Sequence, residues 1–336
     1  MKTGVLLVNL GTPDSPSVKD VRKYLFEFLN DPRVIDIPSV IRFFLVNFII
    51  VPFRAPKSAE IYKMLWTEKG SPILIFGESV KEKLQKELGE NYEVELAMRY
   101  QNPSLDDVLA RMRVKNYRKI IVIPLFPQYA SATTGSVIEK VMKIVSRWWV
   151  IPEIKFIGQF FDNEGYLNTI AEQSKKYKLS EYDHILFSFH GLPERQVDKV
   201  HFDGKPCSDH KCDEVLTDEN IYCYKATCYA TARLLAKKLN IHIDKYTVCF
   251  QSRLDKKWLK PFSDEVVIEQ AKKGAKKLLV FSPAFVADCL ETTVEIGIEY
   301  QKLFEQHGGE KVQLVESLND HPMWVTALKE IVLKEN

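Results

Sequence analysis

Short, nearly continuous apolar runs alternate with longer stretches of helical periodicity along the chain. Runs of four to six residues rich in aliphatic and β-branched side chains predict strands at 4–9, 93–98, 119–124, 155–158, 184–188, 247–250, 278–282 and 312–315. Because apolar and polar residues do not alternate within these runs, we expect both faces of the strands to be covered. Helical patterns, such as 103–114 and 222–239, lie between them. The alternation predicts an α/β fold with parallel sheets.

The two halves of the chain resemble each other. The segment GVLLVNLG at 4–11 parallels HILFSFHG at 184–191, and 118–124 parallels 276–282. In the second pairing Thr134 falls opposite Thr292. Chance similarity between strands is one explanation, but two related doubly wound domains explain the pattern better. We predict Rossmann-like domains at 1–160 plus 318–336 and at 161–317, with the last helix packed back on the first domain.

The composition suits a large folded protein without a strongly charged face. The chain has 336 residues, of which 46% are hydrophobic, and a formal net charge of +2. This balance argues against nucleic acid as a partner. No signal-peptide pattern opens the sequence, so we expect a cytoplasmic protein. The longest apolar segment, 41–53, includes Arg42 and Asn47, and is expected to be too short for a membrane span, which needs roughly 20 apolar residues.

Ligands of parallel sheets bind beyond the carboxyl ends of the strands, so the residues after each strand are candidates for chemistry. The strand at 184–188 leads into Phe189-His190-Gly191-Leu192-Pro193, where glycine and proline favour a turn. A histidine presented there can bind a metal or carry a proton near neutral pH. A lone histidine is more often structural, so a functional role for His190 needs further evidence from the rest of the sequence.

Four carboxylates follow the strand at 278–282. They are Asp288, Glu291, Glu295 and Glu299. Their spacing of 3, 4 and 4 residues places them along one face of a helix. A solvated helix face is the common explanation of such a pattern. Because the ladder starts at a strand end in the same half as His190, we favour a route for a hard cation or for protons.

Several collinear segments resemble the ferrochelatase family. The most specific are FSFHGLPER at 187–195 and SPAFVADCLETTVEIGIEY at 282–300. Others are LLVNLGTP, RAPKSAEIY, AMRYQNPS, PLFPQYASATTGS and FQSRLDKKWLKP. The resemblance covers nearly the whole chain and is nearer to Gram-negative members around Cys289. It implies an enzyme that inserts ferrous iron into protoporphyrin IX, forming protohaem and releasing two protons, with a porphyrin cleft between two Rossmann-like domains.

The resemblance also implies roles for single residues. His190 matches the signature histidine, Glu291 its partner carboxylate, and Glu295 and Glu299 an acidic path for the metal. Positions that hold the porphyrin propionates are matched by Arg54, Lys57 and Ser71, and pocket-lining positions by Leu10, Arg99 and Tyr129. Two questions stay open: which of His190 and Glu291 takes protons and which guides iron, and whether protoporphyrin or coproporphyrin is preferred.

Four cysteines lie within 22 residues after the His190 motif. They are Cys207, Cys212, Cys223 and Cys228, in the pattern C-x4-C-x10-C-x4-C. In a cytosolic chain such a group suggests metal binding more than disulfides. Some ferrochelatases carry a two-iron two-sulfur (2Fe–2S) cluster, and four thiolates can hold one. Zinc and free thiols are the alternatives, with His201 and His210 as replacement ligands.

Other interpretations remain for part of the chain and for its activity. The apolar segment 41–53 is a buried helix, a lip over the macrocycle, or a transient contact with a membrane surface. A cobalt or nickel chelatase and a non-enzymatic haem-binding protein are the alternative functions, although the acid ladder would serve no purpose in the second. Neither Gly11 nor Gly191 opens a G-x-G-x-x-G run, which disfavours nucleotide binding. The oligomeric state is undetermined.

Overall fold

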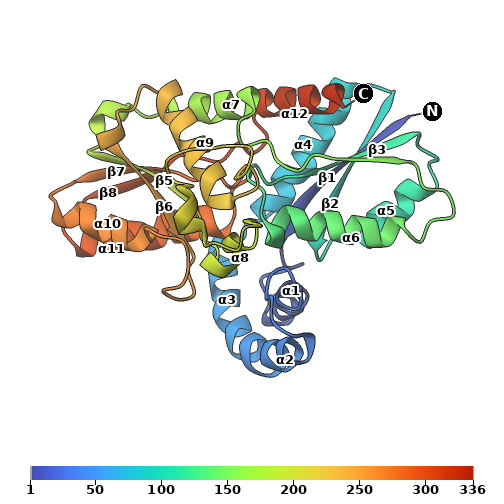
Figure 1. Cartoon of the computed structure of the whole chain (residues 1–336), viewed down its shortest axis with the longest axis horizontal. Helices are drawn as coiled ribbons and strands as arrows, with labels where there is room; N and C mark the ends of the chain where they lie inside the picture. The colour runs from blue at the N-terminus through green and yellow to red at the C-terminus, as the bar shows by residue number, and fades with distance from the viewer. Residues whose placement is uncertain (1, 336) are drawn as a thin grey trace. The chain divides into compact units, whose positions relative to one another are not determined.

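The computed structural model describes residues 2–335, which form two compact units (Figure 1). Unit 1 comprises residues up to Phe126, Ser131–Gln159 and the residues from Val325 onward. Unit 2 comprises Pro127–Ala130 and Phe160–Trp324. Each unit holds one four-stranded parallel sheet, as the alternation of strand and helix patterns predicts.

The units differ from the predicted domain boundaries at Phe160 and at two short segments. Pro127–Ala130 and residues 318–324 belong to unit 2. The backbone N–H of Phe160 donates to the carbonyl of Pro127 at 2.9 Å. The buried ring of Trp324 packs on Phe160 with centroids 5.6 Å apart. These contacts join residues distant in sequence, so no local pattern reveals them.

Unit 1 is built on a sheet of order β2-β1-β3-β4. Its strands are β1 (Thr3–Gly11), β2 (Tyr92–Tyr100), β3 (Lys119–Pro124) and β4 (Glu153–Phe156). All neighbours pair in parallel. The central strand β1 is buried from Gly4 to Asn9, which explains its continuous apolar sequence.

Helices cover both faces of this sheet (Figure 1). Apart from residues 39–65, the helices of unit 1 are α1 (Val18–Leu29), α4 (Pro72–Leu88), α5 (Leu105–Arg113), α6 (Ser136–Val145) and most of α12 (Pro322–Lys334), with the short π-helix η2 (Ser131–Gly135) before α6. On one face, Leu109 of α5 and Val141 of α6 pack with Leu6 and Val122 of the strands. α4 packs on β1 and β2 from the other face. The apolar stripes of these helices therefore meet a sheet that is apolar on both sides.

A continuous helix of 27 residues, Ser39–Leu65, extends from unit 1, and we call it the helical arm. It consists of α2 (Ser39–Phe44), the π-helix η1 (Leu45–Ile50) and α3 (Val51–Leu65). The expectation that no segment here is long enough for a membrane span was wrong. The arm contains an 18-residue window of mean hydropathy 1.5, of which 17% is buried. Counting an unbroken apolar run missed it, because the helix continues through Arg42, Asn47 and two prolines.

Unit 2 repeats the topology of unit 1, with strand order β6-β5-β7-β8. The strands are β5 (His184–His190), β6 (Tyr246–Gln251), β7 (Lys277–Phe281) and β8 (Lys311–Leu314). β5 corresponds to β1 and β7 to β3, which confirms the duplication predicted from the sequence. Thr134 and Thr292 are both fully buried in π-helical segments, so their predicted equivalence also holds.

Helices cover both faces of the second sheet as well (Figure 1). The helical segments of unit 2 are α7 (Glu164–Ser174), η3 (Leu179–Glu181), α8 (Glu194–Asp198), η4 (Cys207–His210), α9 (Tyr224–Lys238), η5 (Ile243–Lys245), α10 (Ser263–Lys272), η6 (Leu290–Tyr300) and α11 (Gln301–Gln306). Val267, Ile296 and Phe304 pack with Leu186 and Leu278 on one face. α9 covers the other face and contacts α7 and β6.

The helix predicted for the acid ladder is a π-helix. η6 keeps π geometry over 11 residues and carries Glu291, Glu295 and Glu299. Segments of π-helix are rare and often occur at functional sites. The sequence spacing gives no signal for this, because residues four apart lie near one face in both kinds of helix.

Candidate active site

His190 is the last residue of β5, at the carboxyl end of the unit 2 sheet. Its Nδ1 lies 2.6 Å from the carbonyl oxygen of Gly191. Because a carbonyl only accepts, Nδ1 carries the proton of the neutral ring and Nε2 keeps a lone pair. Tyr224 Oη donates to the His190 carbonyl at 2.9 Å. The rings of Trp258 and Phe285 flank the imidazole, each with a centroid distance of 6.4 Å.

Gly191 allows the turn after His190 to lie directly on a neighbouring segment. Its N–H donates to the carbonyl oxygen of Gln251 at 2.8 Å. A Cβ at this position would lie 2.8 Å from that oxygen and 3.2 Å from Trp258 Cε3. One residue further along, the Leu192 carbonyl accepts a hydrogen bond from Leu259 N–H at 2.9 Å. The close approach explains why glycine follows the histidine.

Gln251 connects both predicted catalytic residues. It lies beside His190 in the parallel register of β5 and β6. Its Oε1 accepts a hydrogen bond from Ser188 Oγ at 2.8 Å. Its Nε2 donates to the Glu291 carbonyl at 2.9 Å and to Glu295 Oε2 at 3.2 Å. One side chain thus ties the start of η6 to the strand end that carries His190.

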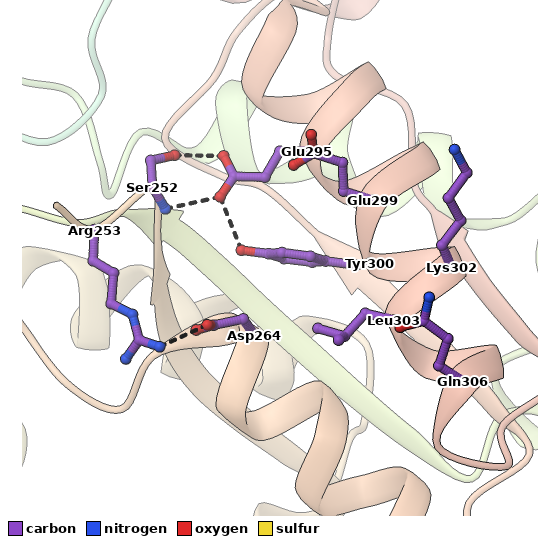
Figure 2. A pocket seen from close by; sticks show the side chains of 9 residues that line it. All are labelled: Ser252, Arg253, Asp264, Glu295, Glu299, Tyr300, Lys302, Leu303 and Gln306. Carbon is purple, nitrogen blue, oxygen red and sulfur yellow. Dashed lines mark hydrogen bonds and ion pairs between the residues drawn. The ribbon is translucent and has the colours of Figure 1, made fainter. Parts of the chain in front are cut away.

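Glu295 is held in place by hydrogen bonds, as Figure 2 shows. Besides Gln251, the donors are Ser252 N–H at 2.8 Å, Ser252 Oγ at 2.5 Å and Tyr300 Oη at 3.0 Å. Ser252 adopts a left-handed backbone with φ 63°, and its N–H and hydroxyl both reach the same carboxylate. Burial raises the pKa of Tyr300, so its hydroxyl stays protonated and remains a donor.

Glu295 and Glu299 line a cavity of about 430 Å³ within unit 2 (Figure 2). Across it, Arg253 forms ion pairs at 2.7 Å with Asp264 and Glu265. Burial, and secondarily the charge of Glu295, raises the pKa of Glu299. A nearby cation favours the ionised form of a carboxyl group, so a cation in this cavity would counteract the raised pKa of Glu299.

Asp288 is engaged elsewhere and does not continue the ladder. Its carboxylate accepts hydrogen bonds from Ser317 N–H at 3.1 Å and Asn319 Nδ2 at 2.7 Å. The ladder therefore has three members, and Asp288 anchors the loop before α12.

The residues matched to propionate binding lie in unit 1. Arg54 and Lys57 are exposed on α3, one turn apart. Ser71 is buried immediately before α4, where it accepts a hydrogen bond from the Thr12 hydroxyl at 2.9 Å. Leu10 is half-buried near the end of β1. The cationic side chains of Arg54 and Lys57 are thus accessible to a ligand, whereas Ser71 is part of the packed interior.

Arg99 takes part in a buried ion pair. Its Nη2 lies 2.5 Å from Asp31 Oδ2, and the two side chains are 13% and 3% exposed. Asp31 also accepts hydrogen bonds from Tyr100 Oη at 2.8 Å and Ser136 Oγ at 2.5 Å. The guanidinium is therefore held in the interior of unit 1. Tyr129 lies in unit 2, edge-on to Tyr222.

Three of the four clustered cysteines gather with a histidine. His201, Cys207, Cys212 and Cys223 are all buried, and one ligand atom from each lies within 4.8 Å of the others. Hydrogen bonds from the neighbouring Cys207 and Cys223 thiols, together with the nearby His201, lower the pKa of Cys212. A lowered pKa favours the thiolate, which is the form of cysteine that binds metals.

Cys228, the fourth cysteine of the predicted set, is not among these four closely spaced ligands. It is fully buried on α9 and interacts with the Tyr224 hydroxyl. Burial raises the pKa of its thiol well above the usual value. Cys223 precedes α9, whereas Cys228 lies more than one helical turn further on, which accounts for their separation.

Sequence reasoning missed several residues of the site. Gln251, Ser252 and Tyr224 position Glu291, Glu295 and the His190 backbone, and none of the three was predicted to do so. Gln251-Ser252 follows a predicted strand, which is the one sequence signal that marked them. Tyr224 gave no such signal, since it is a helix residue brought to the site by the tertiary fold.

Comparison with known proteins establishes the family. The sequence matches the ferrochelatase family over residues 2–336. The chain belongs to the ferrochelatase family. It is 45% identical to a ferrochelatase of Legionella pneumophila, with 99% of each chain covered, and 43% identical to a ferrochelatase of Coxiella burnetii, covering 99% of this chain and 94% of the relative. The activity is the insertion of ferrous iron into a porphyrin for haem synthesis, as the resemblance of the motifs implied.

Solved structures support the fold. SirB from Bacillus subtilis with Fe³⁺ is similar with a TM-score of 0.57 at 15% identity, over 99% of this chain and 95% of that one. The sirohydrochlorin chelatase SirB from Bacillus subtilis subspecies spizizenii, in complex with cobalt, gives a TM-score of 0.54 at 15% identity, with the same coverage of 99% and 95%. At this identity the likeness concerns the fold alone.

Proposed function

We propose that His190 Nε2 and the Glu291 carboxylate act at the porphyrin centre of a cytoplasmic enzyme that uses protoporphyrin IX. The orientation of His190 carries the proposal. Its Nδ1 is committed to the Gly191 carbonyl at 2.6 Å, so Nε2 is the nitrogen with a lone pair for a proton or for iron. Glu291 is tied to the same strand end through Gln251.

Metal insertion requires two pyrrole protons to leave and water to be stripped from the iron. A flat porphyrin hides its nitrogen lone pairs, so an enzyme gains by binding a bent ring. Arg54 and Lys57 are exposed cations that suit the porphyrin propionates, and such remote contacts supply binding energy for the distortion. His190 and Glu291 then accept the released protons or pass the iron to the ring nitrogens.

The iron route is proposed to start at the cavity beside η6. Glu295 and Glu299 line it and provide oxygen ligands for a hard cation. The donors that fix Glu295 keep its carboxylate in one orientation, directed between the cavity and Gln251. Glu291 is one helical turn further toward the strand end, so iron passes along one face of η6.

The test is anaerobic insertion of ferrous iron into protoporphyrin IX and coproporphyrin III, followed by loss of free-porphyrin fluorescence. His190→Ala should lose about two decades of turnover or more, since one general base contributes about 10²–10⁴-fold. Its circular dichroism should match that of the parent. Near-normal turnover of the variant would refute the role of His190, and preference for coproporphyrin would refute the choice of ring.

The helical arm is proposed to touch a membrane surface transiently. Phe44, Phe48 and Phe53 are 59%, 63% and 74% exposed, which places large apolar rings in solvent. Liposome flotation with the parent and with Phe48→Ser/Phe53→Ser tests this. The parent should float with vesicles and the double variant should not, whereas equal flotation would contradict the contact.

The insertion between β5 and α9 is proposed to hold a resident metal group. A 2Fe–2S cluster was expected on four cysteines, but the residues that gather are three cysteines and His201. Histidine replaces cysteine in some such clusters, so the cluster and a single ion are the two candidates. The geometry of the ligand atoms distinguishes them.

A further inference from the structure

We infer that His201, Cys207, Cys212 and Cys223 bind one tetrahedral ion of the zinc type, in place of an iron–sulfur cluster on four cysteines. This site lies in the insertion, apart from the residues proposed for iron insertion. The inference deepens the proposed metal group and does not depend on the roles proposed for His190 or Glu291.

The distances between ligand atoms fit a single ion. Cys207 Sγ and Cys223 Sγ are 3.5 Å apart, and Cys212 Sγ and His201 Nε2 are 3.8 Å apart. Zinc–sulfur bonds of about 2.3 Å and zinc–nitrogen bonds of about 2.0 Å at the tetrahedral angle give ligand separations of about 3.5–3.8 Å. A two-iron cluster separates the ligands of its two irons further, because a second metal and bridging sulfides lie between them. No pair of ligand atoms in this group exceeds 4.8 Å.

The ligand set is one that zinc uses in structural sites. Three cysteines and one histidine form a common closed tetrahedral set, and Cys207 and Cys212 have the short spacing of four intervening residues. Four protein ligands complete a tetrahedral set, and all four are buried, so the ion would have no open position for substrate. The ion is therefore structural and distinct from the iron that enters the porphyrin.

Surrounding residues orient these ligands, as expected around a metal site. Asn220 Nδ2 donates to Cys212 Sγ at 3.6 Å and to the Val215 carbonyl at 3.0 Å. The ring of His210 stacks on His201 with centroids 4.0 Å apart and an interplanar angle of 5°. Contacts of this kind fix the Cys212 sulfur and the His201 imidazole in position for the ion.

The position of Cys223 gives the ion a role in the active site. Its neighbour Tyr224 donates to the His190 carbonyl at 2.9 Å. Its other neighbour, Tyr222, packs edge-on against Tyr129 with centroids 5.6 Å apart. Anchoring Cys223 therefore fixes two tyrosines that support His190 and a residue matched to the porphyrin pocket. Both tyrosines act as positioning residues.

The experiment measures metal and acid-labile sulfide in full-length protein, produced with both iron and zinc supplied and purified without air. We expect about one zinc per chain and no sulfide. Replacing zinc by cobalt should give the intense visible bands of a tetrahedral thiolate site. His201→Ala and Cys212→Ser should lose the ion. Cys228→Ala and Cys249→Ala, the matched buried controls, should keep it.

Two results would overturn the inference. Two irons and two sulfides per chain, retained in His201→Ala and lost in Cys228→Ala, would show a four-cysteine cluster. Protein without bound metal in the unmodified chain would show that the thiols are free. The metal and sulfide contents are measured first in the parent protein, so a variant that fails to fold does not affect these two results. Turnover is measured separately, so failure of the catalytic proposal is distinguishable.

Discussion

Replacing Gly191 by alanine tests the close approach that positions His190. The backbone of Gly191 lies outside the left-handed region, so alanine adopts it without conformational strain. The added Cβ would lie 2.8 Å from the Gln251 carbonyl oxygen, whereas ordinary contacts begin at 3.4 Å. The two segments must therefore separate by about 0.6 Å.

That separation has a structural and a catalytic effect. It lengthens the hydrogen bond from Gly191 N–H to the same oxygen beyond its normal range, which costs about 1 kcal/mol. Steric overpacking typically adds about 1–3 kcal/mol. We expect the free energy of unfolding to fall by about 2–4 kcal/mol. Turnover should fall by about tenfold or more, because the carbonyl that orients His190 moves with the turn.

Urea unfolding and anaerobic turnover measure the two effects. Gly158→Ala is the matched control, because a Cβ at Gly158 meets no atom within 4 Å. The control should match the parent in both assays. If Gly191→Ala stays within about 0.5 kcal/mol and twofold of the parent, the steric argument is wrong.

Two further predictions concern buried and titrating charges. Asp31→Asn breaks the buried ion pair with Arg99 and should lower the free energy of unfolding by about 3 kcal/mol. The control Glu60→Gln breaks the exposed ion pair with Lys63 and should lower it by less than about 1 kcal/mol. Equal effects of the two variants in urea unfolding would contradict this prediction. Glu299 has a raised pKa in the folded protein, so stability falls as pH rises from the unfolded value of about 4.5 through the folded pKa. Glu299→Gln should remove that slope when unfolding is compared between about pH 4 and pH 7, and an unchanged slope would assign it to another group.

The sequence by itself determined the architecture and the elements that carry the chemistry. Strands such as β1 and β5 are buried on both faces, so their apolar runs are continuous and easily read. Repetition of the pattern predicted two equivalent sheets. The rule that ligands bind at carboxyl ends of strands singled out His190 and the acids after β7.

The tertiary structure alone decided how these residues are held and which of them act together. The Gln251 contacts to Glu291 and Glu295, and the bond from Tyr224 to His190, join segments 34 to 44 residues apart. The gathering of His201, and not Cys228, with the other three cysteines has the same origin. Cys228 is closer to Cys223 in sequence, but helix α9 carries it away, while the loop before η4 brings His201 back. Spacing along the chain reports local geometry, whereas a metal site depends on where distant backbone segments meet.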